Sequence, residues 1–254
     1  IAGQTNGTSG YEEAACQGLL AGINAALYLQ GKQPLILSRA EAYTGVLIDD
    51  LVTLGTREPY RMFTSRAEYR LCLRHDSADM RLLPHGHAIG LQSEEAMARF
   101  EEKKRSIDEV KELLNNRRVS ETENDISLPE SLKKYAGKTL GHLLKTGEVS
   151  IEELIGIEPG LRGRPREWLE QAELDIRYEG YIKRQEQQIA RFQKMEELTI
   201  PQDFDYDRVE GLSNEGRQKL KAIRPVSVGQ ASRISGVRAG DVAVLLVHIS
   251  RRDA

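Results

Sequence analysis

The chain has 254 residues, of which 30% are charged, and its formal net charge is -3 at pH 7. This length allows one large domain or two small ones with a sizeable core, and the near-neutral charge excludes a polycationic protein, so any nucleic-acid contact must come from a local patch. No apolar run is long enough to span a bilayer, no signal peptide is visible, and two cysteines, Cys16 and Cys72, are too few for a disulfide framework, so we expect a cytoplasmic protein.

A loop rich in glycine and hydroxyl groups, residues 3–10, precedes the first predicted helix, which spans residues 11–29 and stops at Gly31. Ser9 and Glu12 have the spacing of a capping box, which fixes where a helix begins. Unpaired N–H groups at a helix start carry a partial positive charge. The segment by itself therefore predicts either a site for an anion or a flat ligand, or a helix packed tightly on a sheet.

The next part of the chain carries conflicting signals. Residues 35–54 predict a second helix with Ser38 as its cap. In residues 56–83 the spacing of Ser65 and Glu68 allows a capped helix. A period-two alternation there favours short strands instead, and its apolar members are Tyr69, Leu71 and Leu73. We expect a hairpin in this region.

From residue 93 onward, apolar residues recur with helical spacing. The predicted helices cover residues 93–118, 129–145 and 151–155, then a long helix that carries Trp168 and ends before Pro201, and finally residues 213–223, 227–234 and 239–249. The predicted fold class is mainly α-helical, with a helical domain, a small C-terminal helical bundle and a minor β element.

The best candidate for a nucleic-acid contact is a run of arginines with tyrosines between them. Its members are Arg57, Arg61, Arg66, Arg70, Arg74 and Arg81, with Tyr60 and Tyr69 interleaved. Guanidinium groups bind phosphates and stack on bases, and exposed tyrosine rings offer a platform for a flipped base. The alternative is that several of these arginines pair with neighbouring carboxylates. A second candidate is Lys183 with Arg184 beside Tyr181, which forms either a phosphate-contacting ridge or a solvated helical face.

The last two predicted helices have the outline of a helix-turn-helix. The final one, residues 239–249, has almost nothing polar to reach base edges, so it suits a protein partner better than DNA, and a self-buried small core is the alternative. His75, His85 and His87 lie near two aspartates, but such patterns are common by chance and we expect no metal site. No residue can be assigned a catalytic role.

Five segments resemble the MnmG (GidA) family of tRNA-modifying flavoproteins, in the family's order. They are residues 2–18 (AGQTNGTSGYEEAACQG), 45–53 (GVLIDDLVT), 58–71 (EPYRMFTSRAEYRL), 178–185 (YEGYIKRQ) and 230–237 (QASRISGV). Nothing downstream resembles the glycine-rich strand–turn–helix that would hold the pyrophosphate of a dinucleotide. We therefore expect a fragment of a larger α/β flavoprotein, one that is inactive by itself.

The resemblance implies a division into four parts. Residues 1–33 are the C-terminal piece of the FAD-binding domain, 34–92 a linking region with the arginine-rich hairpin, 93–200 a helical domain, and 201–254 a helical bundle that docks a partner. The parent enzyme is expected to add a carboxymethylaminomethyl or aminomethyl group at carbon 5 of the wobble uridine of tRNA, using FAD, NADH and methylene-tetrahydrofolate together with the GTPase MnmE. It is expected to be a homodimer at full length that binds neither DNA nor a membrane.

With the resemblance, the candidate residues fall into three groups. The cofactor is expected to meet Gly7, Thr8, Ser9, Gly10 and Tyr11, RNA to meet Arg57, Arg61, Arg66, Arg70, Lys183 and Arg184, and MnmE to meet Ile234, Val237, Val242, Leu245 and Leu246. Two alternatives stay open. One is a folate- and FAD-dependent tRNA methyltransferase of the TrmFO type, which the helical stretch 93–249 disfavours. The other is a non-catalytic RNA- or protein-binding module.

Overall fold

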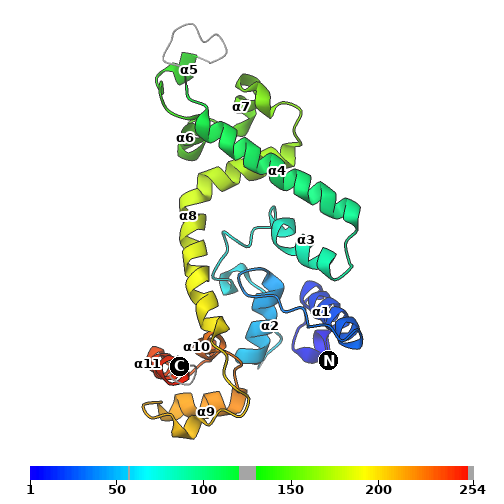
Figure 1. The fold of residues 1–254 in the computed structure, drawn as a ribbon, viewed down its shortest axis with the longest axis vertical. Helices are drawn as coiled ribbons and strands as arrows, with labels where there is room; N and C mark the ends of the chain where they lie inside the picture. The colour runs from blue at the N-terminus through cyan, green and yellow to red at the C-terminus, as the bar shows by residue number, and fades with distance from the viewer. Residues whose placement is uncertain (57, 120–129, 251–254) are drawn as a thin grey trace. The chain divides into compact units, whose positions relative to one another are not determined.

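The computed structural model describes residues 1–56, 58–119 and 130–250, and over them the prediction of a mainly α-helical fold is confirmed (Figure 1). The contacts divide the chain into two compact units. Unit 1 consists of Ile1–Leu73 and Gln185–Ala254, and unit 2 of Arg74–Arg184. The division into four parts stays a prediction.

Unit 2 is a helical domain with one continuous core. Its elements are α3 (Ala78–Ala88), α4 (Glu94–Asn116), α5 (Glu130–Lys133), α6 (Leu140–Thr146), α7 (Ile151–Ile157), the short 3-10 helix η3 (Pro159–Leu161) and the first part of the long helix α8 (Arg166–Glu197). Leu143, Leu154 and Leu161 are fully buried in that core. At the start of α7, Ser150 and Glu153 form a capping box, in which each side chain binds the backbone N–H of the other residue.

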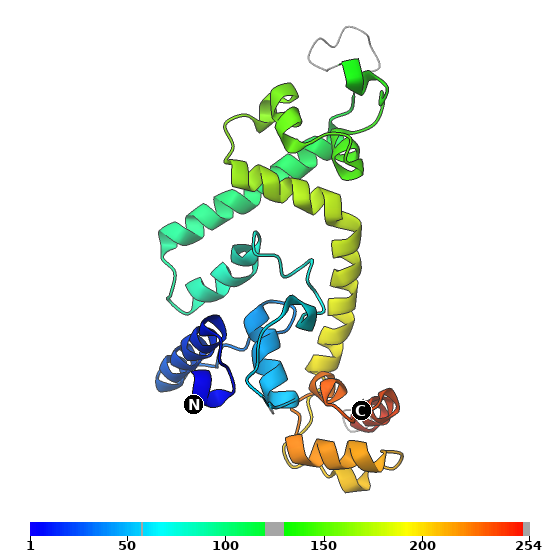
Figure 2. The ribbon, with the colours of Figure 1, turned by 180° about the vertical axis from the view of Figure 1, so that it is seen from behind.

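Unit 1 is built from both ends of the chain. Its elements are the 3-10 helix η1 (Gly3–Asn6), α1 (Tyr11–Leu29), α2 (Tyr43–Thr53), the 3-10 helix η2 (Thr64–Arg66), the end of α8, the 3-10 helix η4 (Tyr206–Arg208), α9 (Asn214–Ile223), α10 (Val228–Arg233) and α11 (Ala239–Ser250). Tyr206, Leu220 and Leu245 are fully buried at the centre of the terminal bundle. The bundle contacts the N-terminal elements, with α10 beside α2 in both views (Figure 1, Figure 2).

The predicted hairpin in residues 56–83 is wrong. In the described part of this range the chain forms η2 and then turns before α3 begins. Tyr69 and Leu73 are both buried because the backbone turns back on itself, so that the N–H groups of Cys72 and Leu73 both donate to the carbonyl oxygen of Tyr69 at 2.9 Å. The alternation of apolar residues therefore marks a tight turn. Among the described residues β pairing is limited to isolated bridges, one of which joins Thr8 and Tyr60 in parallel.

Two helices differ from their predicted ranges: one starts later, and the other is divided in two. The helix over residues 35–54 starts only at Tyr43. The side-chain amide of Asn24 pairs with both backbone groups of Leu35, at 2.7 and 3.0 Å, and the N–H groups of Glu41 and Ala42 then close a turn on the carbonyl oxygen of Ser38. The helix over residues 129–145 is interrupted between α5 and α6, where Gly137 has a φ of 78°. Residue 129 itself lies outside the described residues.

Candidate functional site

The glycine loop, residues 3–10, is held in place by one side chain of α1. Gln17 is 3% exposed, and its Nε2 donates to Thr8 Oγ1 at 3.0 Å. Its Oε1 accepts from Asn6 Nδ2 at 2.8 Å and from the backbone N–H of Gly3 at 3.3 Å. Gly7 closes η1 with a φ of 86°, a conformation that glycine adopts without strain. The loop is therefore positioned by the helix that follows it.

The start of α1 differs from the predicted capping box. Gly10 is the N-cap, and no side chain caps the helix at that position. Glu13 approaches it instead: a Cβ on Gly10 would lie 1.8 Å from Glu13 Oε2, so a larger residue there would displace the Glu13 carboxylate. The backbone N–H groups of Met62 and of Glu13 itself bind the Glu13 carboxylate and hold its pKa below the usual value, against the smaller opposing effect of burial.

The five predicted cofactor residues lie together at this loop. Thr8 is 1% exposed and its hydroxyl is bound by Gln17, so it could offer a ligand only its backbone. Ser9 is exposed, Gly10 is buried, and Tyr11 projects into solvent with 91% exposure. A hollow of about 260 Å³ adjoins the loop and is lined by Gln4, Gly7, Thr8, Ser9, Thr56, Glu58 and Pro59.

These residues fit the electron-rich edge of a flat ring. The first bond inside α1 runs from the N–H of Ala14 to the carbonyl oxygen of Gly10 at 3.0 Å, so the N–H groups of Tyr11 and Glu12 lie before the first helical bond. Donors in this position, at the positive end of a helix, stabilise negative charge on a bound group. The start of α1 therefore offers backbone donors for a negatively charged group.

Three of the predicted RNA-binding arginines lie in the arginine segment, which we define as residues 58–70. Arg61 is 60% exposed at its side chain, with Nε 3.9 Å from Glu13 Oε1. Arg66 donates from Nε to the carbonyl oxygen of Arg61 at 2.9 Å and stacks 4.4 Å above the ring of Tyr60. Arg70 is exposed. Arg57 lies outside the described residues.

The tyrosines of this segment are not the exposed platforms that we predicted. Tyr60 is 5% exposed, and its hydroxyl donates to Asp50 Oδ2 at 2.6 Å. Burial, with the neighbouring Asp50 carboxylate, raises the pKa of Tyr60. Tyr69 is 7% exposed and meets Phe192 edge to face, with the ring centroids 6.3 Å apart. Both rings anchor the segment, because their apolar bodies are more stable in the core than in water.

Lys183 and Arg184 belong to unit 2, on α8. Both are exposed. The Arg184 guanidinium lies 5.0 Å from the ring centroid of Tyr181, and its Nε donates to the carbonyl oxygen of Gly180 at 3.1 Å. Both positive charges are therefore available at the surface of this helix.

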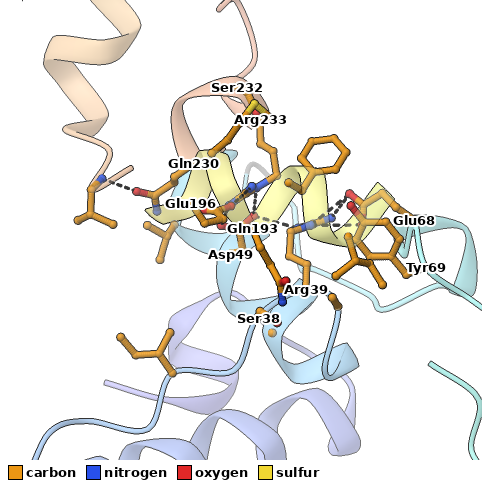
Figure 3. Close-up of a pocket in the computed structure, with 18 of the residues that line it drawn as sticks. Ser38, Arg39, Asp49, Glu68, Tyr69, Gln193, Glu196, Gln230, Ser232 and Arg233 are labelled. Atoms are coloured by element: carbon orange, nitrogen blue, oxygen red, sulfur yellow. Dashed lines mark hydrogen bonds and ion pairs between the residues drawn. The ribbon is translucent and has the colours of Figure 1, made fainter. Parts of the chain in front are cut away.

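A groove of about 770 Å³ lies in unit 1 (Figure 3). It lies between α2, the end of α8, α10 and α11 and the loop residues 36–40. Large apolar side chains with substantial exposure rim it, namely Ile36, Val52, Phe192 and Val226. Apolar side chains that remain exposed together in a groove are typical of binding surfaces.

Charged side chains at this groove are paired with one another (Figure 3). Arg233 binds Asp49 with two parallel bonds, Nε to Oδ2 at 2.7 Å and Nη2 to Oδ1 at 2.8 Å, and it also pairs with Glu196. Arg39 binds the same Asp49 at 3.0 Å and Glu68 at 2.7 Å. Two guanidinium groups thus share one carboxylate and link α2 to α10 and α8.

The five predicted partner-binding residues divide between the core and the groove. Leu245 and Ile234 are 0% and 2% exposed in the core of the bundle, and Val237 packs against that core half-buried. Val242 and Leu246 line the groove. Val242 is only 9% exposed and also belongs to the core of the bundle, so the self-buried alternative accounts for four of the five. Leu246, half-buried against that core, is the one of these five that a partner could reach in the groove.

Sequence reasoning assigned no role to Glu13, Gln17, Asp49 or Arg233. Glu13 and Gln17 are four residues apart on α1 and both are buried, so they share the face that packs on the loop. A polar pair with this spacing on a helix of small residues could have predicted a polar contact on one face of α1. The pairing of Asp49 with Arg233, 184 residues apart, left no local signal.

Neither a metal-binding cluster nor a membrane-spanning helix is found among the described residues. The described residues contain no group of three or more histidine, cysteine, aspartate or glutamate side chains that could hold a metal ion. Of the predicted histidine cluster, His87 pairs with Glu94 at 2.9 Å. Within the same residues, every helix is too short or too polar to cross a membrane.

Comparisons with known proteins agree along the chain. Three family profiles match: "Glucose inhibited division protein A" over residues 1–33, "tRNA modifying enzyme MnmG/GidA C-terminal helical domain" over 94–186, and "tRNA modifying enzyme MnmG/GidA C-terminal helical bundle" over 188–254. A solved structure of GidA from Aquifex aeolicus is similar with a TM-score of 0.83 at 41% identity, covering 98% of this chain and 39% of that one.

Curated relatives carry one name. The chain is 53% identical over 250 residues to the "tRNA uridine 5-carboxymethylaminomethyl modification enzyme MnmG" of Borreliella burgdorferi strain ZS7, and 51% identical over 253 residues to the protein of that name from Caldicellulosiruptor saccharolyticus. Each alignment covers 98% of the chain and 40% of the relative. The chain therefore spans about 40% of the length of these relatives.

Proposed function

The chain belongs to the MnmG/GidA family, and on that premise we propose that it is the C-terminal part of a flavin-dependent enzyme that modifies carbon 5 of the wobble uridine of tRNA. The observation that carries the proposal is the match over 98% of the chain to relatives named for this modification. The protein would act in the cytoplasm as a homodimer at full length. In this division of labour the chain supplies one edge of the cofactor site, a surface for tRNA and a docking surface for MnmE.

At the cofactor edge the chain contributes backbone groups. FAD would be the redox cofactor of the site, with NADH as its reductant, and a one-carbon unit from methylene-tetrahydrofolate would pass to carbon 5 of the uridine. The N–H groups at the start of α1 would bind the ring edge and stabilise negative charge there. Gln17 fixes the glycine loop through three of its residues, so the backbone is already in place before a ligand binds.

For tRNA, the arginine segment is the best-supported surface. Replacing Arg61, Arg66 and Arg70 together by alanine in the full-length protein should weaken tRNA binding by roughly tenfold or more. It should also flatten the dependence of log affinity on log salt by about three, because each lost phosphate contact lowers that slope by about one. Filter binding at several salt concentrations measures both quantities.

A control triple variant removes the same charge elsewhere on unit 1. Arg208 and Arg238 have side chains 85% and 73% exposed, and Lys219 is also exposed, all of them in the terminal bundle. Alanine at these three positions should leave the affinity for tRNA within about twofold and the salt dependence of that affinity nearly unchanged, since surface cations away from the site add little. Equal losses in both triple variants would mean that net charge, and not the arginine segment, governs binding.

For MnmE, the groove is the proposed docking surface. Its apolar rim and internally paired charges suit the apolar face of a helix of the GTPase. Val226→Glu at the rim, where Val226 is 63% exposed, should lower the affinity for MnmE by at least about tenfold, because a carboxylate would be buried without a partner. Val247 provides the matched control: it is 54% exposed on α11 and does not line the groove.

Isothermal titration with purified MnmE separates the outcomes for this surface. Val247→Glu should bind as the unchanged protein does, and both variants should keep their flavin. A loss of binding in Val247→Glu with normal binding in Val226→Glu would place the contact on another face of the bundle.

A further inference from the structure

Glu13 occupies a position where two proposed binding surfaces meet. It is 8% exposed, it lies in the first turn of α1, and its Oε1 accepts from the backbone N–H of Met62 at 2.9 Å. Met62 lies in the arginine segment, next to Arg61. The carboxylate also lies against Gly10, where a Cβ would displace it. One buried side chain thus contacts both the glycine-loop end of α1 and the arginine segment.

A second contact runs in parallel to the first. The backbone N–H of Tyr60 donates to the carbonyl oxygen of Gly7 at 2.6 Å, as part of the bridge between Thr8 and Tyr60. Side chains on successive residues of an extended segment point to opposite sides. Two backbone anchors, at Tyr60 and Met62, therefore fix the direction of the residue between them, which is Arg61.

We propose that Glu13 is a positioning residue that sets the arginine segment in register with the cofactor loop, so that a tRNA held by the arginines is placed relative to the flavin edge. This inference rests on the proposed function. It deepens it by joining the two surfaces through a single carboxylate, and it assigns Glu13 no contact with substrate or cofactor.

The hydrogen bond to Met62 can be tested on this chain without RNA or flavin. In Glu13→Ala, the Met62 amide should exchange its hydrogen at least about tenfold faster, because its acceptor is gone. Glu13→Gln keeps an acceptor of the same size and should keep the amide protected. Glu12→Ala removes an exposed carboxylate from the same helical turn and should change nothing. Unchanged Met62 exchange in Glu13→Ala would overturn the inference.

The positioning role is tested with tRNA affinity in the full-length protein. Glu13→Ala should weaken binding about as much as the triple arginine variant does, and should add less than about a twofold further loss in that triple variant, because both changes remove the same contacts. Glu13→Gln should bind within about threefold of the unchanged protein. If the loss of tRNA affinity in Glu13→Ala multiplies with the loss in the triple arginine variant, the two changes act independently and the positioning role is wrong. A Glu13→Gln protein whose Met62 amide stays protected but which loses tRNA binding would also overturn that role.

The two levels of the proposal fail in different ways. If the triple arginine variant binds tRNA normally, the RNA surface of the proposed function is wrong. The hydrogen exchange of the Met62 amide then still tests the contact between Glu13 and the arginine segment. If Glu13→Ala does not fold, Glu13→Gln and the exchange of its Met62 amide decide the outcome alone.

Discussion

Replacement of Asp49 by alanine should destabilise unit 1 by roughly 3 kcal/mol, the lower end of the range for breaking a buried ion pair. The side chains of Asp49, Arg39 and Arg233 are 14%, 12% and 20% exposed, so water compensates little for a lost partner. Arg39 keeps Asp50 and Glu68 and Arg233 keeps Glu196, which holds the loss at the lower end. The change also removes the bond that ties α2 to α10 beneath the groove.

Urea unfolding followed by circular dichroism measures this loss. Asp203 is exposed, and Asp203→Ala should change the free energy of unfolding by less than about 0.5 kcal/mol. Asp49→Asn keeps the shape but not the charge and should fall between the two. A loss below about 1 kcal/mol for Asp49→Ala would mean that the arginines are solvated well enough without it.

The second large effect is expected at Asp241, where alanine should cost roughly 3 kcal/mol. Asp241 is 3% exposed, and its Oδ1 accepts from the Ser213 N–H at 2.6 Å and its Oδ2 from the Arg238 N–H at 3.0 Å. It therefore joins the starts of α9 and α11. Removing it leaves two backbone donors unpaired, and each such bond to a charged group contributes about 1.5–3 kcal/mol.

The pH dependence of Asp241→Ala follows from the same bonds. Burial raises the pKa of Asp241, but the N–H groups of Ser213 and Arg238 outweigh it and hold that pKa below its usual value. A lowered folded-state pKa gives stability that is present above the unfolded value, near 3.9, and lost as pH falls through the folded value. The difference in unfolding free energy from Asp241→Ala should be full at pH 7 and shrink below about pH 4. A difference independent of pH would assign the effect to lost packing.

Much of the helical framework could be predicted because its signals are local. Ser93 caps α4 where the apolar period begins, and the three terminal helices follow the spacing of their buried residues. The hairpin prediction failed because the alternation at Tyr69 to Leu73 reports burial, and a turn closed on the Tyr69 carbonyl buries the same two residues as a strand would. The second helix was predicted to start too early, because the side-chain amide of Asn24, which lies outside the predicted range, binds the backbone N–H and carbonyl groups of Leu35.

The candidate site was predictable in outline and not in detail. The motif around Gly7 to Tyr11 predicted the glycine loop and the start of α1, since its glycines and helix start are contiguous. The role of Glu13 depends on Met62, 49 residues away, and that of Asp49 on Arg233, 184 residues away. Burial of the Tyr60 and Tyr69 rings likewise depends on Asp50 and Phe192. Such partners come together only when unit 1 folds.

The central claim, that this protein acts on the wobble uridine of tRNA, is tested most directly by mass spectrometry of tRNA nucleosides. Bulk tRNA would be compared between source cells, cells that lack the gene, and the same cells carrying the full-length gene again. We predict that the uridine bearing a carboxymethylaminomethyl or aminomethyl group at carbon 5 disappears on deletion and returns with the gene. An unchanged amount of that nucleoside after deletion would contradict the proposed function.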